Sequence, residues 1–183
     1  MLDAAPRLAT EAVDRGATRE DPAGWYFDAI THYVYEGDTA LHVAAAAYDV
    51  PTATRLLALG GDPNAVNRRG ATPLHYACDG VPDGPAWDPA AQAAVVTLLI
   101  ASGADANATD KSGVAPVHRA VRTRCSEAVR ALLVAGADAS LRNRSGSTPI
   151  DLARMTTGRG RSGSPASRRE QQAIIEMLTA RDA

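Results

Sequence analysis

Three histidines, His42, His75 and His118, recur at matching positions along the chain, and imidazole is a common metal ligand and general base. A zinc site would need further ligands close by, yet none of the three has a cysteine or a second histidine at ligand spacing. His32 stands apart from this series, and we interpret it as a hairpin or surface residue rather than a base. The pattern therefore predicts structural histidines and no metal site.

Three aspartates, Asp62, Asp105 and Asp138, also recur in phase and raise the question of a carboxylate cluster for acid–base chemistry. Each stands at the same turn position, where a short side chain accepts hydrogen bonds from nearby backbone N–H groups. We therefore interpret them as turn residues rather than catalytic residues. Because the sequence offers no nucleophile and base pair in a suitable context, we expect neither an enzyme nor a cofactor.

Residues 158–163 read Gly-Arg-Gly-Arg-Ser-Gly and match the spacing of a dinucleotide-binding fingerprint. That motif needs a strand before it and a helix immediately after it, so that the helix N-terminus meets the pyrophosphate. Here the segment follows a predicted first helix inside a repeat, and we reject that interpretation. The segment is interpreted as a flexible basic loop, with the alternative that Arg159 and Arg161 grip an anion.

Repeated elements must position all of these residues, because two landmarks recur in step along the chain. The first landmark occupies residues 37–42, 70–75, 113–118 and 146–151, at offsets of 33, 43 and 33 residues. The second occupies residues 61–64, 104–107 and 137–140. Threonine and proline at the start of most units and paired apolar residues further on predict a helix, a turn, a second helix and a hairpin. Units this thin must stack to bury their apolar faces.

A 33-residue unit that opens with Thr-Pro-Leu-His at residues 72–75 and closes with Gly-Ala-Asp at residues 103–105 resembles the ankyrin repeat. The resemblance implies an all-α fold, an ankyrin-repeat solenoid of stacked helix-turn-helix units with short β-hairpin loops. It also implies imidazoles that hydrogen-bond the neighbouring backbone, and a concave surface used for binding. The expected divisions are an N-terminal capping segment at 1–37, repeat 1 at 38–70, repeat 2 with a helix-turn insertion at 71–113, repeat 3 at 114–146, and a C-terminal repeat 4 with a Gly/Arg/Ser-rich insertion at 147–183.

The cysteines, the N-terminal residues and the charge pattern indicate the cellular location and the source of the protein. Cys78 and Cys125 lie in different repeats without a partnering motif, which predicts reduced thiols in a cytoplasmic protein. Residues 1–15 lack the apolar run of a secretory signal, and no apolar stretch of the sequence is long enough to cross a membrane.

The charges are unevenly distributed along the chain. Residues 1–110 carry six basic and fifteen acidic side chains, whereas residues 111–169 carry twelve basic and three acidic side chains. Eighteen of the nineteen basic residues are arginines, which together with the many alanines indicates a GC-rich bacterial genome.

Aromatic residues gather in two places. Five of the eight lie between Trp25 and Tyr35, before the first complete repeat, and we expect them to cover the exposed end of the stack. The alternative is that they are exposed binding anchors. Trp87 lies in the Pro-rich insertion of repeat 2, where it either anchors a partner or pins its own loop.

These features predict a non-catalytic protein-binding module whose partner presents an acidic surface. The alternatives are that the Arg-rich C-terminal half binds nucleic acid or another polyanion, or that the insertions build an enzyme site. Positions that face solvent in the family, together with residues of the insertions, give the expected partner-binding set: Tyr35, Glu36, Asp38, Arg68, Arg69, Asp79, Trp87, Lys111, Ser112, Arg122, Thr123, Arg144, Ser145, Met155, Arg159 and Arg161. The arginines expected to attract the acidic surface are Arg119, Arg122, Arg124, Arg142, Arg144, Arg154, Arg159 and Arg161.

Overall fold

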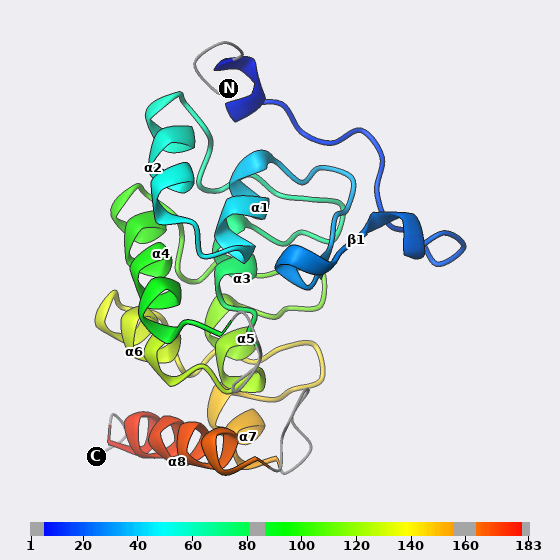
Figure 1. Cartoon of the computed structure of the whole chain (residues 1–183). Helices are drawn as coiled ribbons and strands as arrows, with labels where there is room; N and C mark the ends of the chain where they lie inside the picture. Colours follow the sequence, from blue (N-terminus) through cyan, green and yellow to red (C-terminus); the bar gives the residue numbers. More distant parts are fainter. Residues whose placement is uncertain (1–5, 81–86, 156–163, 181–183) are drawn as a thin grey trace.

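The computed structural model describes residues 6–80, 87–155 and 164–180, and within them the fold is built almost entirely from short helices (Figure 1). The α-helices are α1 (Ala40–Ala46), α2 (Val50–Ala58), α3 (Pro73–Ala77), α4 (Pro89–Ala101), α5 (Pro116–Arg122), α6 (Ser126–Val134), α7 (Pro149–Arg154) and α8 (Pro165–Thr179). The segment before them holds the 3-10 helices η2 (Pro6–Ala9), η3 (Ala23–Trp25) and η4 (Asp28–Ile30) and the strands β1 (Tyr26–Phe27) and β2 (His32–Tyr33).

The helices stack in two layers. The odd-numbered helices α1, α3, α5 and α7 pack in succession, and the even-numbered helices α2, α4, α6 and α8 form a second, parallel row (Figure 1). Short turns join α1 to α2 and α5 to α6, and the apolar side chains between the rows form one continuous buried core. The predicted all-α solenoid of stacked helix pairs is confirmed. No helix in the described ranges is both long enough and apolar enough to cross a membrane.

The loops between successive pairs project from one edge of the stack, and their tips are linked by backbone hydrogen bonds. The N–H of Arg68 donates to Glu36 O at 2.7 Å, and that of Lys111 donates to Arg69 O at 2.9 Å. A third link runs from the N–H of Arg144 to Ser112 O at 3.0 Å. The loops between the pairs, expected to be β-hairpins, are tight turns, and their described residues form no β-strand. Below, the inner face means the side formed by these tips and the odd-numbered helices.

The recurring histidines tie one pair to the next. His75 Nδ1 accepts the Thr72 backbone N–H at 3.1 Å, and His75 Nε2 donates to Val114 O at 2.9 Å. His42 makes the equivalent bond to Ala71 O at 3.1 Å, and His118 makes it to Ser147 O at 3.3 Å and also lies 3.0 Å from Leu141 O. All three imidazoles are buried, and each hydrogen-bonds both the start of its own helix and a backbone carbonyl of the next unit. Their predicted structural role is confirmed.

The segment before α1 runs beside the loop tips and then turns onto the inner face. Residues 12–17 extend the row of tips through hydrogen bonds from the N–H of Val13 to Asp38 O at 2.7 Å and from the N–H of Ala17 to Val34 O at 2.8 Å. The antiparallel pair β1–β2 follows, and the His32 ring stacks on Tyr76 of α3 with ring centroids 4.1 Å apart. The β1–β2 hairpin therefore lies beside the odd-numbered helices (Figure 1). Tyr26, Tyr33 and Tyr35 line a cavity there with residues of α1, α3 and α5, so these three do not cover the end of the stack as expected, whereas η2 contacts α1.

Candidate binding site

A cavity of about 570 Å³ opens on the inner face between the β1–β2 hairpin and the odd-numbered helices. This inner-face cavity is lined by tyrosines of the hairpin on one wall, by Trp87 from the segment before α4, and by Arg69, Arg119 and Arg122. Its volume falls within the range of about 300–1,000 Å³ that is typical of ligand pockets. Three sequence-distant elements therefore meet around one hollow.

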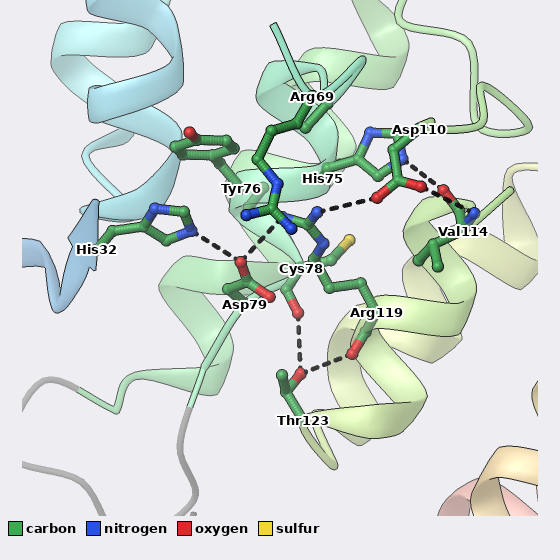
Figure 2. A network of polar contacts seen from close by, with 12 residues as sticks. His32, Arg69, His75, Tyr76, Cys78, Asp79, Asp110, Val114, Arg119 and Thr123 are labelled. Atoms are coloured by element: carbon green, nitrogen blue, oxygen red, sulfur yellow. Dashed lines mark hydrogen bonds and ion pairs between the residues drawn. The ribbon is translucent and has the colours of Figure 1, made fainter. Parts of the chain in front are cut away.

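Arg119 of α5 stands at the centre of a polar network beside this cavity (Figure 2). Its Nη1 lies 3.0 Å from Asp79 Oδ2 and its Nη2 lies 3.6 Å from Asp110 Oδ2. His32 Nε2 lies 2.8 Å from the same Asp79 oxygen, which links the hairpin to the end of α3. The Thr123 hydroxyl donates to Cys78 O at 2.9 Å, which fixes α5 against α3.

Opposite charges keep this network ionised despite its burial. Burial alone would raise the pKa of Asp79, but the Arg119 guanidinium and the His32 hydrogen bond hold it below its ordinary value. Burial would likewise lower the pKa of Arg119, yet the carboxylates of Asp79 and Asp110 raise it. The pair is therefore charged at neutral pH, and removing one partner would leave a poorly compensated buried charge.

The two cysteines are chemically quiet. Both thiols are buried and free, as expected for reduced cysteines. Burial raises the pKa of Cys78 well above its ordinary value and that of Cys125 to about 11. Because the thiolate is the reactive form, neither cysteine is poised as a nucleophile.

The recurring aspartates behave as turn residues, as predicted. Asp62 Oδ1 accepts the Asn64 N–H at 2.8 Å, and Asp105 and Asp138 make the same bond two residues on, each at 2.8 Å. Among the described residues, no group of three or more His, Cys, Asp or Glu side chains is placed to hold a metal ion.

The structure divides the expected partner-binding set into groups. Seven members line the inner-face cavity: Tyr35, Arg69, Asp79, Trp87, Ser112, Arg122 and Thr123. Six others are exposed outside it: Glu36, Arg68, Lys111, Arg144, Ser145 and Met155. Arg159 and Arg161 lie outside the described residues.

Two members of the set are not solvent-facing, which corrects the expectation. Asp38 is fully buried, where its Oδ2 accepts the Tyr76 hydroxyl at 2.7 Å and its Oδ1 accepts from Asn67 Nδ2 at 2.9 Å. Thr123 is 7% exposed because its hydroxyl is used against Cys78 O. The position of a residue in a repeat does not reveal a buried polar neighbour such as Tyr76, which here draws the Asp38 carboxylate inward.

The basic cluster expected to attract an acidic surface is also smaller than its sequence suggests. Arg119 is 8% exposed and holds two carboxylates. Arg124 is 3% exposed, and its Nη1 donates to the Ser167 hydroxyl at 2.7 Å. These two arginines stabilise contacts between units and offer little charge to a partner.

Sequence reasoning missed His32, Tyr76 and Asp110 as parts of the site and did not foresee the partners of Arg119. One signal was available, because the 43-residue offset places Arg119 in register with Tyr76, one helical turn before Asp79. Because the repeats stack in register, a basic residue at the position of Arg119 faces the end of the first helix of the preceding repeat, where Asp79 lies. His32 gave no such signal, since its segment has no counterpart in the repeats.

The stacked helix pairs, the linked tips and the hollowed inner face define a helical repeat protein with a binding surface along one side. Family models agree with this geometry: the one described as Ankyrin repeat matches residues 36–68 and 69–111, and the one described as Ankyrin repeats (many copies) matches residues 93–153. The chain belongs to the ankyrin repeat family, whose members typically serve as protein–protein interaction modules and are usually non-catalytic. A search of curated proteins found no match.

Proposed function

We propose that this protein is a non-catalytic binding module that holds another protein against its inner face. The observation that carries the proposal is the inner-face cavity, which brings seven of the sixteen expected contact residues together. Exposed aromatic side chains border it, with Tyr26 at 40% and Tyr33 at 38% of their area open to solvent. Aromatic residues and arginines around a hollow are the side chains that dominate protein–protein binding energies.

The exposed tips supply the charge that would select the partner. Arg68, Arg69, Lys111 and Arg144 are all exposed on successive loop tips, and the linked backbone of these loops holds them in a row. Such a row favours an acidic partner surface and speeds the encounter with it. Because this attraction acts between exposed charges, it should weaken as salt rises.

A charge-reversal experiment tests this proposal. The partner is first isolated with the full chain from the native host and then titrated against the purified protein at low and high salt. Replacing Lys111 and Arg144 with Glu should weaken binding at low salt by about tenfold or more, mainly through a slower association rate. Arg130→Glu is the matched control, because Arg130 is exposed on α6 in the other row of helices and should leave binding unchanged. Equal affinity of the double variant and the control would refute the proposal.

Nucleic-acid binding is less well supported by the same residues. The burial of Arg119 and Arg124 removes two cations from the cluster, and Asp79 and Asp110 place negative charge at the inner face. A titration with labelled RNA and DNA at two salt concentrations separates the two functions. Salt-dependent nucleic-acid binding in the micromolar range, unaffected by the isolated partner, would favour the polyanion alternative.

A further inference from the structure

We propose that the inner-face cavity receives one acidic side chain of an extended segment of the partner, together with an apolar or aromatic side chain next to it. This inference rests on the proposed function and adds the chemistry of the segment that enters the cavity. The module would then recognise a short motif in the partner, in addition to the general attraction between an acidic surface and the loop tips.

The cavity contains donors that lack an acceptor. Arg119 Nε and Trp87 Nε1 are both buried, belong to residues that line the cavity, and have no hydrogen-bond partner in the described part of the chain. A buried donor without an acceptor is unfavourable, so such groups mark places where an acceptor is expected. The oxygens of a carboxylate are acceptors only, and hydrogen bonds from a guanidinium to a carboxylate are among the stronger ones in proteins.

The charges around the cavity favour one negative group. Asp79 and Asp110 both pair with Arg119, whereas Arg69 makes no ion pair with any described residue. The Arg69 guanidinium instead lies 5.1 Å from the centre of the Tyr35 ring and donates to the Tyr35 hydroxyl at 3.1 Å. Figure 2 shows its side chain extending toward the Asp79–Arg119 network. Arg69 is thus held in place at the cavity with its charge still available to a guest.

The same charges disfavour a polyanion. Asp79 and Asp110 both line the cavity. A single carboxylate can pair with Arg69, whereas successive phosphates would meet the two aspartates as like charges. A segment of protein with one acidic residue therefore fits better than a nucleic-acid strand.

The hairpin wall accounts for the apolar neighbour. The rings of Tyr26 and Tyr33 lie 4.9 Å apart, and those of Tyr33 and Tyr35 lie 6.4 Å apart, so three aromatic rings lead from the hairpin to Arg69. Two of these rings are more than a third exposed, and an apolar or aromatic side chain would cover them. The acid would then lie at the arginine end of the row, with the apolar residue against the tyrosines.

Nitrogen-15 NMR of the full chain tests this directly, because indole and arginine N–H groups give their own signals. The probes are acetylated, amidated peptides with a central Phe-Asp pair in a Gly/Ser background, and the same peptides carrying Phe-Asn. We expect the Phe-Asp peptide to shift the Trp87 Nε1–H and Arg119 Nε–H signals and to bind at least about tenfold more tightly than the Phe-Asn peptide. A third peptide, with its only carboxylate at a free C-terminus, should bind no better than Phe-Asn.

Two arginine variants provide the matched comparison. Arg69→Gln should weaken binding of the Phe-Asp peptide about tenfold, whereas Arg130→Gln should not. Arg130 is exposed on α6 in the other row of helices and does not line the cavity. Equal binding of the Asp and Asn peptides, equal loss in both variants, or no binding up to about 1 mM would overturn the inference. If the peptide experiments fail but the isolated partner still binds in a way that depends on Lys111 and Arg144, the proposed function stands and only the inference about the cavity is wrong.

Discussion

Mild acid should destabilise the stack through its buried histidines. In His75 the Nδ1 atom accepts a backbone N–H and the Nε2 atom donates to a carbonyl, so the imidazole is neutral in the folded protein. Adding a proton at Nδ1 would break the bond to Thr72 and bury a positive charge. Burial accordingly lowers the pKa of His75 from 6.5 to about 4.

The size of the effect follows from that difference. Above pH 6.5 the unfolded chain gains nothing from protonating this imidazole, so its full contribution to stability is present. As the pH falls from 6.5 toward 4, His75 becomes protonated in the unfolded chain but stays neutral in the folded protein. The free energy of unfolding therefore decreases. At about pH 5 the loss from His75 alone is about 2 kcal/mol. Burial also lowers the pKa of His42 and His118, so both add to the loss in the same direction.

Urea unfolding followed by far-UV circular dichroism between about pH 7.5 and pH 5 measures this loss. The His75→Asn variant is the control: it should be less stable at pH 7.5, but its stability should fall about 2 kcal/mol less than that of the native protein by pH 5. A native protein whose unfolding midpoint stays constant over this range would refute the reasoning. So would a variant with the same pH dependence as the native protein.

Further substitutions test individual contacts by the same unfolding assay. Gly113→Ala should cost about 3 kcal/mol and Gly146→Ala only about 1 kcal/mol, because both have positive φ but only the first would place a Cβ 3.0 Å from a backbone nitrogen; equal costs would contradict this. Arg119→Met should destabilise by about 3 kcal/mol, since it leaves two carboxylates without their cation, and a change below about 1 kcal/mol would show that the ion pair is not needed. Tyr76→Phe should cost about 2 kcal/mol, because the buried Asp38 carboxylate loses a donor at 2.7 Å, and Asp38→Asn should then recover part of the loss in the double variant.

The stacked helices and the role of the histidines could be predicted because the information is repeated. Each unit carries the same landmarks, so the spacing of His42, His75 and His118 fixes which side chain meets the backbone of the next unit. Repetition also predicts which positions form the loop tips. These predictions depend on local contacts between neighbouring units, which a periodic sequence determines directly.

The cavity could not be predicted, because its wall comes from a segment outside the repeats. Nothing in the spacing of residues 21–33 indicates that this segment folds back onto the inner face, where His32 reaches Asp79. The exposed basic cluster was predicted too large for a related reason. Counting charges along the sequence assigns Arg119 and Arg124 to the surface, whereas each is buried beside acceptors from a neighbouring unit.

Hydrogen exchange of the full chain, with and without the isolated partner, tests the central claim most directly. If the partner docks on the inner face, its binding should slow exchange in the β1–β2 hairpin, at the loop tips around Arg69 and Ser112, and in α5. Slower exchange confined to α2, α4, α6 and α8 would place the partner on the opposite row of helices and contradict the account.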